Sequence, residues 1–136
     1  MKTMVLLPLL GLAACVQTPG ERARAAQDQA AQQQKLATAL AGLTPGEPTS
    51  CIDQIQLRSG SNVQAYGSTL VYTVSPRLKY RTDTAGGCEG VGNDDILITS
   101  TPTTQLCRGD IARTVDRTSR FPNGSCSFGA FIPYRR

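Results

Sequence analysis

The stretch TLVYTVSPRLKYRTD, residues 69–83, decides the fold class of this 136-residue chain. Residues 69–74 are rich in β-branched and aromatic side chains, and residues 78–83 alternate apolar with charged ones, which is typical of strands. The residues between them, Ser75, Pro76 and Arg77, have the composition of a turn. Together they predict a β-hairpin.

Further short strands are expected after the hairpin, at residues 96–100, 110–116 and 127–133. Clusters of Gly, Asn and Asp predict turns between them, at residues 85–87, 90–94 and 122–124. Five or six short strands at this spacing favour a mainly β fold, either a small barrel or a sandwich.

Residues 16–50 differ in composition from the rest of the chain, because they are rich in Ala and Gln and contain no aromatic residue. Pro19 near the start and Gly42 just past the end predict a helix over residues 21–41. Its apolar side is mostly Ala, so we expect a partly frayed spacer that would extend about 30 Å if fully helical. A self-associating helix pair is the alternative. Its few large apolar residues are Leu36, Leu40 and Leu43.

Residues 1–14 have the layout of a secretory signal, with Lys2 at the start, a short apolar segment and small residues at the end. The apolar segment is shorter than the roughly 20 residues that a membrane span needs. Leu12-Ala13-Ala14-Cys15 resembles the lipobox of bacterial lipoproteins, whose cysteine is acylated and becomes the first residue of the mature chain. The resemblance implies that Cys15 binds membrane lipid; an ordinary cleaved signal with an incidental Cys15 is the alternative.

The residue after Cys15 is Val16 and not Asp. In Gram-negative lipoproteins this is associated with export to the outer membrane, so we expect an anchor there that faces the periplasm. The sequence then divides into a signal peptide (1–14), a lipid-anchored helical arm with a Pro/Gly linker (15–50) and a disulfide-bonded β domain (51–136).

Four cysteines remain once Cys15 is set aside for lipid, namely Cys51, Cys88, Cys107 and Cys126. An even number in an oxidising compartment predicts two disulfides. The alternatives are free buried thiols or metal ligands, but the chain has no His and no closely spaced cysteine pair for a zinc site. Of the three possible connectivities we favour Cys88 with Cys107 and Cys51 with Cys126, a local clasp nested inside a longer staple.

The net charge of +4 is too small to indicate nucleic-acid binding, and the basic residues are interleaved with acidic ones. A solvated surface is the simplest interpretation, with attraction to anionic lipid or to a cell-wall polymer as the weaker alternative. We expect no nucleic-acid partner.

Four short motifs suggest chemistry but are more simply structural. Residues 90–97 resemble one calcium-binding nonapeptide, yet that architecture needs stacked repeats, and we expect a turn. Adjacent Asp94 and Asp95 would point to opposite faces of a strand. We expect residues 108–110, Arg-Gly-Asp, to form a turn into a strand, and residues 123–125, Asn-Gly-Ser, to form a tight turn.

Catalytic groups are also hard to find in the sequence. Without His, neither a Ser-His-Asp nor a Cys-His arrangement can form. A working pair of carboxylates would have to come from a dispersed set in which no spacing favours any two: Asp53, Asp83, Glu89, Asp94, Asp95, Asp110 and Asp116. We therefore expect no enzyme, no catalytic residues, no cofactor and no metal.

The segment from Cys51 to Tyr134 resembles a family of small, uncharacterised proteobacterial exported proteins with four cysteines. The resemblance rests on the cysteine order, on residues 106–110 (LCRGD) and on the closing residues 124–134 (GSCSFGAFIPY). The size and the anchor also resemble periplasmic lysozyme-inhibitor lipoproteins, which are small disulfide-bonded barrels. These features lead us to expect a non-enzymatic lipoprotein with a binding or structural role toward an envelope protein or the cell wall; the alternative is an inhibitor of a lysozyme-type hydrolase.

Overall fold

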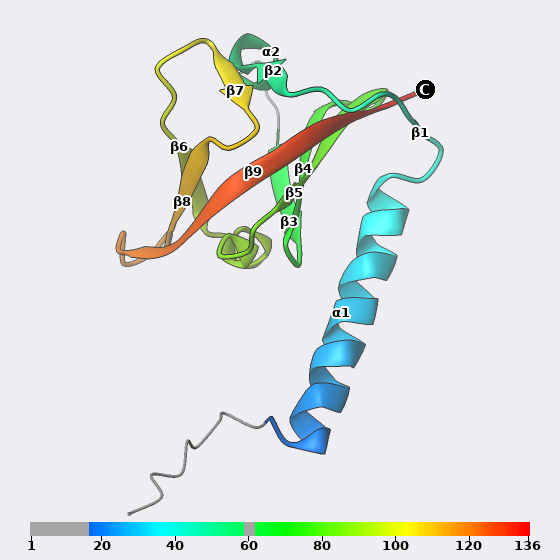
Figure 1. The fold of residues 1–136 in the computed structure, drawn as a ribbon, viewed down its shortest axis with the longest axis vertical. Helices are drawn as coiled ribbons and strands as arrows, with labels where there is room; N and C mark the ends of the chain where they lie inside the picture. Colours follow the sequence, from blue (N-terminus) through cyan, green and yellow to red (C-terminus); the bar gives the residue numbers. More distant parts are fainter. Residues whose placement is uncertain (1–16, 59–61) are drawn as a thin grey trace, which may run out of the picture.

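The computed structural model describes residues 17–58 and 62–136, and it confirms a mainly β fold with a helix near the N-terminus (Figure 1). In chain order the elements are α1 (Pro19–Ala39), β1 (Thr44–Pro45), β2 (Cys51–Asp53), α2 (Gln54–Arg58), β3 (Asn62–Tyr66), β4 (Thr69–Ser75), β5 (Leu78–Thr84), η1 (Glu89–Asn93), β6 (Ile96–Thr99), β7 (Gln105–Cys107), β8 (Ile111–Val115) and β9 (Pro122–Arg135).

Seven of the strands form one antiparallel sheet in the order β3-β4-β5-β9-β8-β6, with β1 added to β9. The sheet curls into a half-barrel, so β3 and β6 remain as its two edges. Strands β2 and β7 form a separate pair. All five strands expected from the sequence are present, including the β4–β5 hairpin, and the structure adds β1, β2, β3 and β7.

The turn expected at residues 122–124 is wrong, because these residues begin the long strand β9. Asn123 makes tertiary hydrogen bonds there: its side chain accepts from Thr114 Oγ1 at 2.7 Å and donates to Asp95 Oδ2 at 2.8 Å. The chain turns earlier, where the Asp116 carboxylate accepts backbone N–H groups and Arg120 has a φ of 63°. The expected Asn-Gly-Ser turn is therefore strand as well.

The main core lies on the concave face of the sheet, where the rings of Tyr72, Phe128 and Phe131 meet with centroids 5.8 to 6.5 Å apart. Ile52 and Leu106 from the β2–β7 pair are buried in the same cluster. The half-barrel is therefore closed over its core by the small second sheet.

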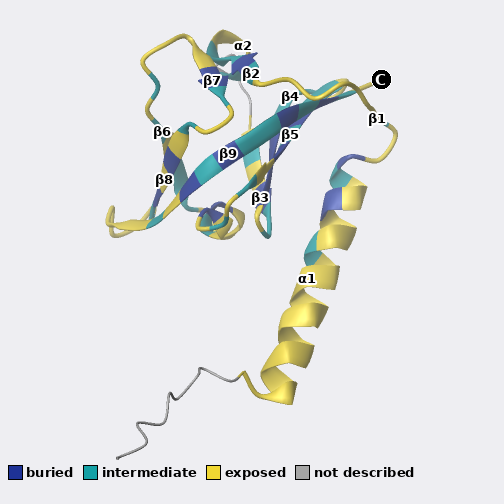
Figure 2. Cartoon of the chain, viewed as in Figure 1, coloured by how far each residue is buried: buried dark blue, intermediate teal, exposed yellow. Residues whose placement is uncertain are grey.

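Helix α1 packs on the opposite, convex face of the sheet through its last turns. Leu36 and Leu40, two of the three leucines expected as anchors, are buried against Val71 of β4. Nearly all of the remaining helix is exposed and projects from the domain (Figure 2). Thr18 and Glu21 form a capping box at its start, which satisfies otherwise free N–H groups.

Residues 44–50, expected as a linker, follow β9 closely. Strand β1 pairs with the end of β9, and Thr49 exchanges backbone hydrogen bonds with Phe131. The segment that connects α1 to the β domain is thus hydrogen-bonded to the sheet, which restricts its conformation.

Two disulfides are present, as expected, but the favoured pairing is wrong. Cys51 is bonded to Cys107, and Cys88 to Cys126. The first pair are direct cross-strand partners in β2 and β7, with Cα atoms 4.0 Å apart. The second joins the residue before η1 to β9. The disulfides join residues that the fold brings together, and they do not follow a nested order along the chain. Strands β2 and β7, which place Cys51 opposite Cys107, are too short to recognise in the sequence.

Candidate functional site

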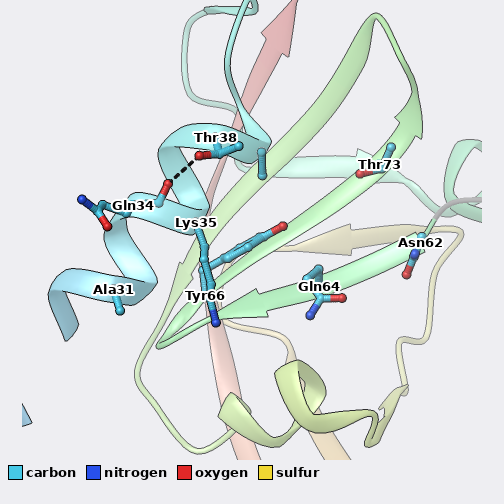
Figure 3. Close-up of a pocket in the computed structure, with 9 residues that line it drawn as sticks. Ala31, Gln34, Lys35, Thr38, Asn62, Gln64, Tyr66 and Thr73 are labelled. Atoms are coloured by element: carbon cyan, nitrogen blue, oxygen red, sulfur yellow. Dashed lines mark hydrogen bonds between the residues drawn. The ribbon is translucent and has the colours of Figure 1, made fainter. Parts of the chain in front are cut away.

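A groove between α1 and the convex face of the sheet is the candidate functional site, which we call the α1–β3 groove (Figure 3). It has a volume of about 680 Å³ and is open to solvent. Its lining residues come from the helix and from two strands: Ala31, Gln34, Lys35, Thr38 and Ala39 of α1, Asn62, Gln64 and Tyr66 of β3, and Thr73 of β4.

The groove exists because α1 contacts the sheet only near its C-terminal end. Leu36 and Leu40 pack on Val71, with Tyr66 and Tyr134 partly buried beside them. Lys79 donates a hydrogen bond to the carbonyl oxygen of Ala39 and so fixes the end of the helix. The preceding helical turns then stand over the sheet without being buried in it.

Strand β3 contributes its polar side chains by simple alternation. Successive residues of a strand point to opposite faces. Val63 and Ala65 face the core, and the residues between them, Asn62, Gln64 and Tyr66, therefore line the groove. A second hollow of about 200 Å³ continues past Gln64 and Tyr66 toward Gln32 and Glu89.

The lining of the α1–β3 groove is polar and almost uncharged. Asn62 and Gln64 offer amide donors and acceptors, whereas the Gln34 amide points away from the sheet (Figure 3), and Lys35 is the sole charged residue in the lining. Thr38 donates its hydroxyl to the carbonyl of Gln34 at 3.0 Å. Side-chain amides beside one tyrosine ring suit ligands with many hydroxyl or amide groups, since each amide can both donate and accept.

The carboxylates considered in the sequence are dispersed, and each is engaged locally. Asp83 pairs with Arg81 at 3.1 Å, and Asp94 pairs with Arg117 at 2.8 Å. The others accept hydrogen bonds from nearby groups: Asp53 from Ile55 N, Glu89 from Gly87 N, Asp95 from Asn123, Asp110 from Cys107 N and Asp116 from Ser119 N. Asp94 and Asp95 nevertheless line one hollow together with Arg117, and the expectation that they point to opposite faces of a strand is wrong, because both residues precede β6.

Two exposed carboxylates have lowered pKa values for reasons of local structure. The backbone N–H and the hydroxyl of Ser119 hold the pKa of Asp116 below its usual value, with a contribution from the N–H of Thr118. The backbone and hydroxyl of Thr18 do the same for the pKa of Glu21 at the start of α1. In both cases hydrogen bonds to the charged form explain the shift, and the groups act as turn and helix caps.

Two of the short motifs noted in the sequence form helical or turn structure. Residues 90–93 belong to the 3₁₀-helix η1, which ends at Asp94 in a left-handed conformation with φ of 75°. Residues 108–110 form the expected turn into β8, in which Asp110 accepts a hydrogen bond from the Cys107 N–H at 2.8 Å. Within residues 17–58 and 62–136, no group of three or more His, Cys, Asp or Glu side chains is placed to hold a metal ion.

The residues of the groove were not expected from the sequence. The signal that could have found them is the alternation in residues 62–66, Asn-Val-Gln-Ala-Tyr, which is typical of a half-buried strand. Nothing in the sequence places Lys35 opposite that strand, because their proximity depends on how α1 docks (Figure 3).

Cys15, the predicted lipid anchor, lies outside the described residues. Within the described part of the chain, no helix is long and apolar enough to cross a membrane. Comparison of the chain with known protein families, with curated proteins and with solved structures finds no match.

Proposed function

We propose that this protein is a non-enzymatic lipoprotein of the outer membrane, anchored through acylated Cys15 and facing the periplasm, which binds a polar component of the envelope in the α1–β3 groove. The observation that carries the binding role is the groove itself, with its amide-rich and nearly uncharged lining. The anchor rests on the resemblance of residues 12–15 to a lipobox.

The chemistry of the groove favours an amide- and hydroxyl-bearing polymer, and the cell wall is such a polymer. Its N-acetyl groups and peptide links would exchange hydrogen bonds with Asn62 and Gln64, while the Tyr66 ring offers an apolar face to a sugar. The carboxylates that could act as acid and base are engaged in caps, turns and ion pairs elsewhere, which supports binding without catalysis.

Co-sedimentation with isolated cell-wall sacculi tests this function. We expect the protein to sediment with sacculi, and the double variant N62A/Q64A to remain in the supernatant. The matched control is R113A, since Arg113 is exposed on β8, away from the groove. Equal sedimentation of all three proteins would contradict the groove assignment.

The same preparation separates wall binding from hydrolase inhibition. If the protein inhibits a lysozyme-type hydrolase, it slows the clearing of sacculi by lysozyme at substoichiometric ratios to the wall; a wall-binding protein does not. The anchor is tested apart from both, by intact mass of the membrane-extracted protein and by release of the Cys15→Ser variant into the soluble fraction.

A further inference from the structure

The two edges of the half-barrel share a pair of adjoining hollows, which we call the β3–β6 seam. The wider hollow, of about 470 Å³, is lined by Val63 of β3 and by Ile96 and Leu97 of β6. The narrower one, of about 220 Å³, is lined again by Val63 and Leu97, and reaches Tyr72 and Leu106 of the core. The seam is therefore a continuous opening between two strand edges.

The backbone of Val63 faces this opening. In antiparallel pairs, successive residues alternate between those bonded to one neighbouring strand and those directed to the other side. Ser68 accepts a hydrogen bond from Thr84 N, so Leu70 and Tyr72 are directed toward β5, and Val71 toward β3. Gln64 is opposite Val71, so its backbone groups bond to β4. By the same alternation, the backbone N–H and C=O of Val63 point away from β4, toward the opening.

The backbone of β6 faces the opening in the same way. Phe128 N donates to Asp110 O, so Ala112 is directed toward β9 and Arg113 toward β6. Arg113 is opposite Ile98, and the backbone groups of Leu97 and Thr99 therefore point outward. No described strand pairs with these outer edges of β3 and β6. Exposed edges of this kind are templates for another strand.

The narrower hollow offers a place for a side chain of such a strand. Its apolar walls are Leu57, Leu97, Leu106 and the ring of Tyr72, and the polar side chains of Gln54 and Thr99 lie at the same hollow. A cavity of about 150 Å³ lined by apolar groups is enough to hold benzene. A hollow of about 220 Å³ thus accommodates a leucine or phenylalanine side chain. The Tyr72 hydroxyl is buried and has no hydrogen-bond partner among the described residues.

We propose that the β3–β6 seam binds an extended peptide segment of a partner protein, which pairs with the outward backbone groups of Val63 in β3 and of Leu97 and Thr99 in β6 and inserts one apolar side chain into the hollow above Tyr72. Strand addition gives affinity through main-chain hydrogen bonds and selectivity through a pocket for alternate side chains, and the seam supplies both. The paired segment is short, because η1 covers the β3 edge beyond Val63, where Gly92 lies against the carbonyl oxygen of Ala65.

The net charge of the wider hollow indicates which kind of peptide binds in the seam. Asp94, Asp95 and Arg117 line the wider hollow, and together they carry one net negative charge. A lysine near one end of the peptide complements it. The seam adjoins the α1–β3 groove at Asn62 and Gln64, but this inference depends neither on the anchor nor on wall binding.

A peptide titration followed by amide NMR tests the proposal on the purified chain. The probe is a short peptide in which threonine alternates with valine around one central phenylalanine, with a C-terminal lysine. We expect saturable shifts at the amides of Val63, Leu97 and Thr99. The matched control peptide carries N-methyl groups on alternate backbone amides, which removes the donors for strand pairing and should abolish the shifts.

The variant Val63→Pro tests the protein side, because proline removes the outward N–H and is tolerated on an edge strand. We expect about tenfold weaker binding, which is the loss of one hydrogen bond. Unchanged shifts with the N-methylated peptide, shifts confined to Lys35 and Thr38 in the α1–β3 groove, or no shifts at millimolar peptide would each overturn the proposal. The N-methylated peptide still tests strand pairing if the Val63→Pro variant fails to fold.

Discussion

The carbonyl oxygen of Gly87 lies 2.1 Å from the position that a Cβ atom on Gly124 would occupy, so the two backbones are in direct contact. The contact is reciprocal, since a Cβ on Gly87 would stand 2.2 Å from the carbonyl oxygen of Ser125. The Cys88–Cys126 disulfide lies beside both glycines in the sequence. This crossing locks the segment after β5 against β9, and it explains why two glycines that look like turn residues serve as packing residues.

The variant Gly124→Ala should destabilise the protein by about 3 kcal/mol, because the new methyl group meets backbone that cannot rotate away. Urea unfolding measures the change. The matched control is Gly20→Ala, which has open space around the new Cβ in α1 and should leave the stability of the domain unchanged. Equal midpoints for both variants would show that the backbones are not in contact.

The disulfide pairing makes a second prediction. Non-reducing peptide mapping should recover Cys51 linked to Cys107 and Cys88 linked to Cys126. Replacing Cys88 and Cys126 together by Ser should lower the free energy of unfolding by about 4 kcal/mol on the loop-entropy model. A peptide that joins Cys88 to Cys107 would contradict the fold, because it would separate β2 from β7.

The sequence predicted the strands whose side chains alternate over several residues and missed those that depend on distant partners. The β4–β5 hairpin was recognisable because residues 69–83 contain both strands and the turn between them. Strands β2 and β7 have three residues each, and they exist because Cys51 and Cys107 face one another across the pair. Asn123 and Gly124 were misassigned because tertiary contacts, and not turn geometry, explain them.

The candidate site was predictable only in part, for a similar reason. Alternation in residues 62–66 gives one wall of the α1–β3 groove. The other wall requires the docking of α1, which depends on just two buried leucines, Leu36 and Leu40, in an otherwise exposed helix. These leucines stand out in a sequence dominated by Ala and Gln, but nothing in the sequence indicates that they pack on Val71 of β4.

Those leucines give a third prediction. Leu36→Ala should release the end of α1 from the sheet, because it removes the most deeply buried side chain of the helix. Buried leucine truncations cost about 2 to 5 kcal/mol, and we expect the lower end because the cluster is small. Hydrogen exchange should then lose protection in residues 32–40 while β4 and β5 keep theirs. Gln29→Ala, on the exposed part of the helix, is the control; loss of protection there too would mean that α1 is not held by Leu36.

The buried hydroxyl of Tyr72 gives a fourth prediction. It has no partner among the described residues, and a buried polar group left unsatisfied costs about 1 to 3 kcal/mol. Tyr72→Phe removes the hydroxyl and keeps the ring between Phe128 and Phe131, so it should raise the free energy of unfolding by about 1 kcal/mol. Tyr80→Phe should give no such gain, because the Tyr80 hydroxyl donates to Gln56 at 3.3 Å.

The Tyr72 hydroxyl also determines whether the free energy of unfolding rises or falls at alkaline pH. Burial raises the pKa of Tyr72 above its ordinary value of 10.0, since the charged phenolate is disfavoured in the core. The unfolded chain therefore loses this proton first as the pH rises. The stability linked to Tyr72 is complete below about pH 10 and falls above it. Unfolding curves at stepwise alkaline pH should show a shallower decline for Tyr72→Phe than for the unaltered protein, and parallel declines would mean that the hydroxyl is exposed or already bonded.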